Sequence, residues 1–132
     1  MLLNTKYTLI LSAFKGASNE VDYIANAKLA HWLQHVAHVN VTQCVGVYKG
    51  GAELSYVVHT NSAQTRRLIT DYALHELEQD SILVSHNRLR DIVLYYAKKE
   101  AQHIGTAFRA NRKQPKANDY TYLDGMYYTV EY

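Results

Sequence analysis

The chain has 132 residues, the length of one domain, and its 48% hydrophobic and 20% charged residues are ordinary for a soluble globular protein. A formal net charge of +2 is too small to indicate a nucleic-acid or membrane partner. Because the N-terminus lacks the pattern of a signal peptide and the one cysteine, Cys44, cannot form an internal disulfide, we expect a single cytoplasmic domain spanning residues 1–132.

The first two thirds of the chain alternate between strand and helix patterns. Residues 6–14 are apolar on both faces, as in a central strand that is covered on both sides. Two strands joined at Gly50-Gly51 predict a β-hairpin, and each predicted helix begins at a capping pattern. In chain order, the predicted elements are a strand at 6–14, a helix at 19–37, strands at 39–49 and 53–60, a helix at 61–78, and strands at 81–85 and 92–97.

The C-terminal third has a different composition. A polar, basic segment at 108–119 contains the one proline and is expected to be a mobile loop. Residues 120–131 then predict a second hairpin, because the turn pair Asp124-Gly125 stands between two tyrosine-rich strands.

The order βαββαβ over residues 6–98 predicts an α+β fold. Short connections and right-handed crossovers favour a ferredoxin-like α-β sandwich, in which an antiparallel sheet carries two helices on one face. The hairpin at 120–131 is expected as an addition to this core. Since the strands are apolar on both sides, the face without helices is expected to pack against another subunit.

Most residues with reactive side chains have an ordinary structural interpretation. His31 and His35 lie four residues apart on one helix, but no third ligand follows in a metal-binding pattern, so we predict no metal site. Cys44 is interpreted as a small strand residue. The basic residues at 109–116 lack the aromatic stacking motif of nucleic-acid-binding proteins, so a solvated surface is the simpler interpretation.

Two positions remain as candidates for a site. Ser12-Ala13-Phe14 lies at the end of the first strand, next to a glycine turn. Tyr48 and Glu53 are expected to face each other across the first hairpin. Taken alone, a carboxylate beside a tyrosine on a hairpin is usually a surface pair.

Several short motifs stand in a characteristic order between Tyr7 and Lys98. They are Tyr7 to Phe14 (YTLILSAF), Asn19-Glu20-Val21, Gly46-Val47-Tyr48 with a following glutamate, and Glu76 to Val84 (ELEQDSILV) leading into Leu94 to Lys98 (LYYAK). In order and spacing they resemble the phage-encoded S-adenosylmethionine lyases, long called S-adenosylmethionine hydrolases. The resemblance implies a homotrimer of α-β sandwiches similar to the PII (GlnB-like) signalling proteins, with active sites between subunits.

The resemblance also implies which residues form the site. Tyr48 and Glu53 match the tyrosine and the essential glutamate of the family. The matching substrate-binding positions are Ser12, Ala13, Phe14, Glu78, Gln79 and Asp80. No metal and no cofactor is implied.

The reaction implied by the resemblance is internal to the substrate. The carboxylate of S-adenosylmethionine attacks its own γ-carbon and releases 5'-methylthioadenosine and L-homoserine lactone, which depletes the methyl donor and counters host restriction-modification. Two alternatives stay open. Glu53 could act as a general base on water and give homoserine directly, or a PII-like trimer could bind a nucleotide between subunits without catalysis.

Overall fold

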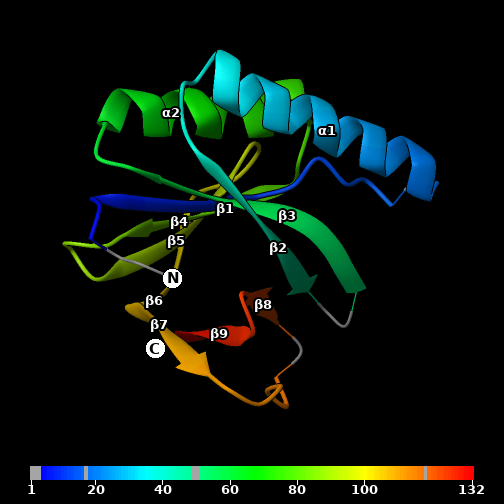
Figure 1. Cartoon of the computed structure of the whole chain (residues 1–132). Helices are drawn as coiled ribbons and strands as arrows, with labels where there is room; N and C mark the ends of the chain where they lie inside the picture. The colour runs from blue at the N-terminus through cyan, green and yellow to red at the C-terminus, as the bar shows by residue number, and fades with distance from the viewer. Residues whose placement is uncertain (1–3, 17, 49–50, 118) are drawn as a thin grey trace.

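The computed structural model describes residues 4–16, 18–48, 51–117 and 119–132. Within these ranges the chain forms nine strands, two α-helices and one π-helical turn (Figure 1). The strands are β1 (Tyr7–Leu11), β2 (Val41–Tyr48), β3 (Gly51–Thr60), β4 (Ser81–His86), β5 (Asp91–Tyr96), β6 (Gln102–Gly105), β7 (Ala107–Asn111), β8 (Tyr120–Leu123) and β9 (Met126–Glu131). The helices are α1 (Asn19–His35) and α2 (Ala63–Asp71), and α2 continues into the π-helical turn η1 (Tyr72–Glu76).

All nine strands belong to one antiparallel sheet, ordered β6-β5-β4-β1-β3-β2-β8-β9-β7. The first strand, β1, lies inside the sheet, with Leu9 opposite Val58 of β3 and Val84 of β4. Both helices cover the same face of the sheet (Figure 1). The position of β1 inside the sheet agrees with the apolar character of both of its sides.

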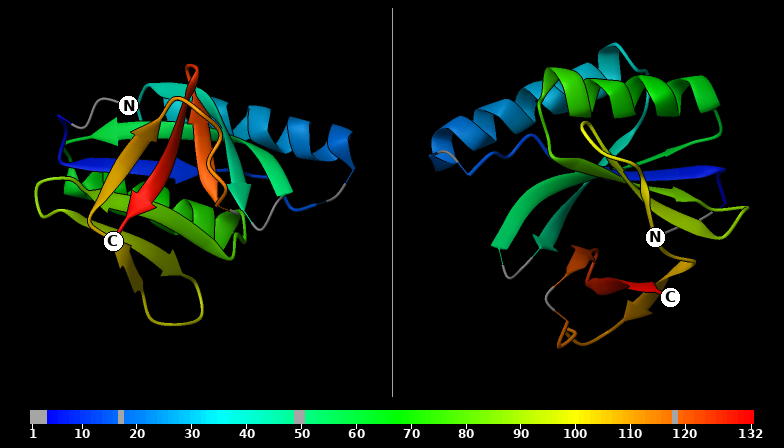
Figure 2. Two further views of the ribbon diagram at one scale, coloured as in Figure 1. Left: turned by 90° about the horizontal axis from the view of Figure 1, so that it is seen from below. Right: turned by 180° about the vertical axis from the view of Figure 1, so that it is seen from behind.

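The C-terminal strands return beneath the face that carries no helix (Figures 1 and 2). Strand β8 pairs with β2, placing Tyr122 opposite Val45, and β9 and β7 continue the sheet from there. Strand β6 leads directly into β7, and the N–H of Thr106 donates to the carbonyl of Glu131 at 2.7 Å. The two ends of the sheet therefore approach each other, and the sheet forms a nearly closed barrel.

The predicted ferredoxin-like (PII/GlnB-like) α-β sandwich is therefore wrong. That prediction ended the sheet at the strand 92–97 and left the hairpin 120–131 as an addition. In the structure β6 extends the sheet beyond β5, and β8 extends it beyond β2. These pairings make a mostly antiparallel, curled sheet of nine strands with two helices, because the hairpin joins the sheet instead of standing apart from it.

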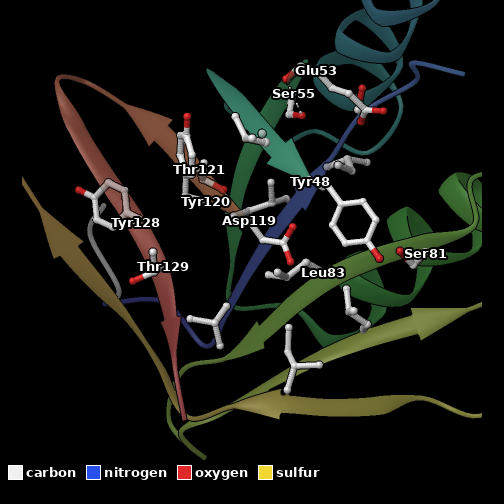
Figure 3. A pocket seen from close by; sticks show the side chains of 18 of the residues that line it. Tyr48, Glu53, Ser55, Ser81, Leu83, Asp119, Tyr120, Thr121, Tyr128 and Thr129 are labelled. Carbon is white, nitrogen blue, oxygen red and sulfur yellow. Dashed lines mark hydrogen bonds between the residues drawn. The ribbon is translucent and has the colours of Figure 1, made fainter. Parts of the chain in front are cut away.

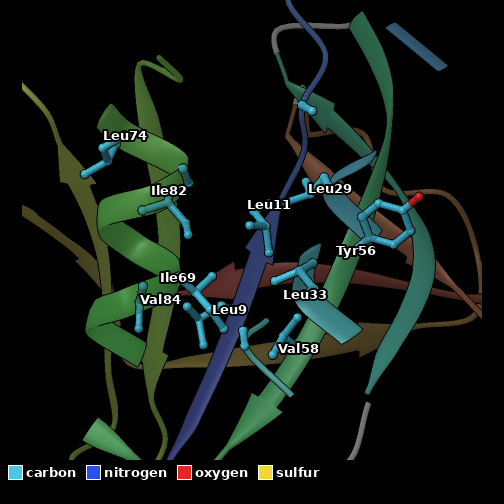
Figure 4. Packing of buried hydrophobic residues seen from close by; sticks show 13 residues of the cluster. Leu9, Leu11, Leu29, Leu33, Tyr56, Val58, Ile69, Leu74, Ile82 and Val84 are labelled. Atoms are coloured by element: carbon cyan, nitrogen blue, oxygen red, sulfur yellow. The ribbon is translucent and has the colours of Figure 1, made fainter. Parts of the chain in front are cut away.

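Two apolar clusters lie on opposite faces of the sheet. The larger cluster fills the space between sheet and helices (Figure 4), and its fully buried members include Leu9, Leu29, Leu33, Val58, Ile69 and Val84. The smaller cluster contains Cys44, Val57 and Leu123, with Ile10 and Tyr128 packed against it. Because this second cluster joins the sheet to its own C-terminal strands, the face without helices is covered within one chain.

Helix α1 changes character along its buried face. Ser18 caps its first turn, where the Ser18 Oγ accepts from the N–H of Val21 at 3.3 Å. The buried positions at helical spacing are Asp22, Asn26, Leu29 and Leu33. The second half of the helix therefore packs into the larger apolar cluster, whereas the first half buries two polar side chains.

The structure shows the second of the two predicted hairpin turns, and it places the start of the basic segment in a strand. Asp124 and Gly125 form the turn between β8 and β9 with φ values of 49° and 78°, the left-handed conformations that a tight hairpin requires. Gly50 of the first predicted turn lies outside the described residues, and Gly51 begins β3. The segment 108–119 was expected to be a loop, but its first residues belong to β7, which pairs with β9.

Candidate active site

A cavity of about 700 Å³ lies between the helix-free face of the sheet and the C-terminal strands (Figure 3). Ile10, Leu83 and Leu94 form an apolar floor on β1, β4 and β5. Tyr120 and Tyr128 contribute to the opposite wall from β8 and β9. A cavity of this size, with an apolar floor and a few polar groups, suits a small-molecule ligand.

Six of the residues predicted from the sequence line this cavity: Ser12, Phe14, Tyr48, Glu53, Gln79 and Asp80. Two other predicted residues lie outside its lining. Ala13 is 2% exposed and belongs to the larger apolar cluster, because successive side chains of an extended segment point to opposite faces. Glu78 has a left-handed backbone (φ 53°), and its exposed carboxylate lies 3.9 Å from the ammonium of Lys15.

Glu53 lies on β3 opposite Gly46 of β2, so no side chain stands across from its carboxyl group on that strand. Burial raises the pKa of the Glu53 carboxyl group, and the negative charge of Asp22 raises this pKa further. The expectation that Tyr48 and Glu53 directly face each other is wrong, because Tyr48 pairs with Gly51. The two side chains nevertheless share one face of the hairpin.

Tyr48 is the last residue of β2, and its side chain reaches over the cavity (Figure 3). The residue is 62% exposed. In the figure its ring extends between the carboxylate of Asp119 and Ser81 at the start of β4. A ligand in the cavity therefore meets both the face of an aromatic ring and a phenol hydroxyl group.

Side-chain hydrogen bonds hold the end of β1 beside the cavity. Ser12 Oγ donates to the carbonyl of Leu54 at 2.8 Å and accepts from the N–H of Phe14 at 3.0 Å. Gln79 Nε2 donates to the carbonyl of Phe14 at 3.1 Å. The two segments that the sequence places in the site, around Ser12 and around Gln79, are thus bonded to each other.

Sequence reasoning missed the wall that the C-terminal third supplies. Its polar members are Asp119, Tyr120, Thr121, Tyr128, Thr129 and Tyr132. The segment 108–119 was interpreted as a mobile loop, and no motif marked the strands that follow. The signal that could have found this wall is the concentration of tyrosines after residue 119, because tyrosine is enriched at binding surfaces.

The cavity is acidic although the whole chain has a net charge of +2. Among the described residues that line it, the carboxylates are Glu53, Asp80 and Asp119, and the one cationic side chain is Lys15. The ammonium of Lys15 lies near Glu78, which is outside the cavity. Because carboxylates outnumber cationic side chains among these residues, the lining complements a ligand that carries positive charge.

Other reactive side chains lie apart from the cavity. In the part of the chain that the structure describes, no three His, Cys, Asp or Glu side chains are grouped to hold a metal ion. The rings of His31 and His35 lie 4.3 Å apart on α1. Burial raises the pKa of the Cys44 thiol to about 12, so the thiol stays protonated and unreactive. None of the described helices is long and apolar enough to cross a membrane.

A curled antiparallel sheet encloses an acidic, tyrosine-lined cavity of a size that suits a small molecule. The model of the S-Adenosylmethionine lyase family matches residues 9–131. The chain belongs to this family and is an S-adenosylmethionine lyase, an enzyme that degrades S-adenosylmethionine. The match includes the C-terminal strands, beyond Lys98 where the resemblance between motifs ended. Comparison with individual curated proteins gives no match.

Proposed function

We propose that the enzyme converts S-adenosylmethionine into 5'-methylthioadenosine and L-homoserine lactone by intramolecular attack of the substrate carboxylate. The observation that carries the proposal is the acidic cavity, which Glu53 lines from β3 and Asp119 lines from the residue just before β8. The substrate carries a sulfonium and an ammonium group, so its charge complements this lining.

The chemistry needs little from the protein beyond positioning. The carboxylate oxygen forms a bond to the γ-carbon while the bond between the γ-carbon and sulfur breaks. The electron pair of the broken bond moves to sulfur, which leaves as a neutral thioether, so no proton has to be transferred. Because both reacting groups belong to one molecule, the main task is to fold that molecule into an attack geometry.

Each proposed role follows from the chemistry of the side chain and its place in the lining. Glu53 binds the amino end or the ribose of the substrate through charge-assisted hydrogen bonds. Tyr48 and Phe14 offer ring faces to the sulfonium or the adenosine. Ser12, Gln79 and Asp80 also line the cavity and help to bind the substrate. Exclusion of water strips hydration from the substrate carboxylate and favours the lactone over hydrolysis.

In the cell, this reaction would act in the cytoplasm, where the methyl donor is made. Depletion of the donor would inactivate host restriction enzymes that require it and would slow DNA methylation. The proposal therefore includes a phage-encoded role against host restriction-modification.

The deciding experiment uses water labelled with oxygen-18 and mass spectrometry of the products. Lactone formation places no label in the lactone, and later ring opening labels the carboxyl group of homoserine. Direct hydrolysis with Glu53 as general base instead labels the γ-hydroxyl group. Label in the hydroxyl group would replace the lyase mechanism by the hydrolase mechanism, and absence of methylthioadenosine would overturn both.

A further inference from the structure

Strands β1 and β3 separate beside the cavity, and a side chain occupies the gap between them. Their pairing ends with Leu11 opposite Tyr56. Continued in the same register, the ladder would place Ala13 opposite Leu54. The carboxamide of Asn26 stands there instead, because its Oδ1 accepts from the N–H of Ala13 at 2.7 Å and its Nδ2 donates to the carbonyl of Leu54 at 2.6 Å.

Asn26 is fully buried, with 0% of its surface exposed, on a helix face whose later positions are leucines. A buried polar side chain is costly unless it is hydrogen-bonded, and here the carboxamide bonds two main-chain groups, the N–H of Ala13 and the carbonyl of Leu54. Its own main-chain carbonyl accepts from the hydroxyl of Tyr56 at 3.1 Å. The carboxamide thus acts as an inserted peptide unit that keeps the two strands apart at a fixed distance.

Both strand segments joined by Asn26 lead into the candidate site. On the β1 side, Ala13 stands between Ser12 and Phe14, which line the cavity. On the β3 side, Leu54 follows Glu53 directly. A second bond supports the same junction, because Ser12 Oγ also donates to the carbonyl of Leu54. A change in the length of this bridge would shift Glu53 relative to Phe14.

We infer that Asn26 is a positioning residue of the lyase site, which sets the distance between the Ser12–Phe14 wall and Glu53 by replacing the missing strand pair. The inference rests on the proposed function, since it assigns Asn26 to the site where the substrate is folded for attack. Asn26 itself does not line the cavity. Its effect on the reaction is therefore indirect, through the two segments that it bridges.

The test compares Asn26→Leu with Tyr56→Phe. Leucine has nearly the shape of asparagine but leaves Ala13 and Leu54 without their bridge. Phenylalanine removes the hydrogen bond to the carbonyl of Asn26 and leaves the bridge in place, so it is a control for loss of a buried hydrogen bond. Asn26→Leu is expected to lower kcat on the order of tenfold to a hundredfold, because small displacements of reacting groups have effects of this size. KM is expected to change less than about threefold, and the Ala13 amide should exchange faster with solvent.

Several outcomes would decide the matter. A kcat of Asn26→Leu within twofold of that of Tyr56→Phe would overturn the inference. Loss of the Asn26 bridge would then affect turnover no more than loss of any other buried hydrogen bond. If Asn26→Leu does not fold, Asn26→Ser, which is smaller and polar, takes its place with the same expected loss of kcat. If the natural protein formed no methylthioadenosine, the proposed function would fail by itself. Exchange at Ala13 and the affinity for S-adenosylmethionine would then still show whether the bridge shapes the cavity.

Discussion

At the scale of single residues, Glu53 combines a position in the cavity with an unusual environment. Glu53→Gln keeps the shape of the side chain and deletes its charge, so we expect a loss of kcat/KM on the order of a hundredfold with an unchanged fold. Glu100→Gln is the matched control, since Glu100 is exposed and does not line the cavity. Steady-state kinetics of both variants check the prediction. Wild-type turnover by Glu53→Gln would remove Glu53 from the mechanism.

The pH dependence of the reaction should report the environment of Glu53. Burial and the charge of Asp22 raise its pKa above the ordinary value of 4.5, and the proposed role needs the ionised form. Activity should therefore fall as the pH drops through this raised pKa, so the acid limb of kcat/KM lies above pH 4.5. Asp22→Asn should move the limb to lower pH, whereas Glu20→Gln on the exposed side of α1 should not. A limb that stays in place in Asp22→Asn would contradict the electrostatic account.

Prediction of individual site residues was limited by side-chain direction. The resemblance between motifs identified Ser12, Phe14 and Gln79, and all three line the cavity. It also included Ala13, whose extended backbone turns the side chain into the apolar cluster, because a motif marks a segment and not the face of each residue. Asp119 was missed because it follows a segment without periodicity, and only the pairing of β8 with β2 brings it to the cavity.

At the scale of elements, local patterns predicted the segments better than their assembly. The strand at 6–14 is β1, and the helix at 19–37 is α1, with ends that differ by a few residues. The fold class was wrong because β6 was not predicted and because the pairing of β8 with β2 joins segments far apart in sequence. Hydrophobic periodicity specifies which face of a strand is buried, but it carries no information on the partner strand.

The contact that closes the barrel depends on Gly105 at the end of β6. A Cβ atom added there would collide with Cγ1 of Val130 and lie 2.7 Å from the carbonyl oxygen of Glu131. Gly105→Ala should therefore displace the C-terminal strands, lower the free energy of unfolding by about 1–3 kcal/mol and raise KM. Gly51→Ala is the control, because a Cβ there meets the carbonyl oxygen of Tyr48 at 3.6 Å, an ordinary contact. Thermal unfolding and steady-state kinetics test both variants. If Gly105→Ala were as stable as the natural protein, the strands around Gly105 would accommodate a Cβ atom and the prediction would be wrong.

At the scale of the whole molecule, the prediction of a homotrimer now rests on the family resemblance alone. The second sheet face no longer requires a partner, since the C-terminal strands cover it. Apolar side chains are nevertheless exposed on and just after α1, where Val21, Ile24 and Val36 are each more than half exposed. Light scattering at micromolar concentration should give three times the 15.1 kDa mass of one chain. A uniform monomer would contradict the trimer and place the complete site within one chain.

The proposed role against restriction can be tested in cells. A protein can oppose restriction by imitating DNA or by depleting the methyl donor, and the net charge of the chain distinguishes these two mechanisms. A protein that imitates DNA would be strongly acidic, whereas this chain has a net charge of +2. Expression in a bacterium should therefore lower S-adenosylmethionine and raise methylthioadenosine together, while incoming unmethylated DNA survives better. Glu53→Gln expressed at the same level should lose all three effects, because each one depends on turnover. Protection that persists with Glu53→Gln while the donor pool is unchanged would mean that the protein acts by binding a partner.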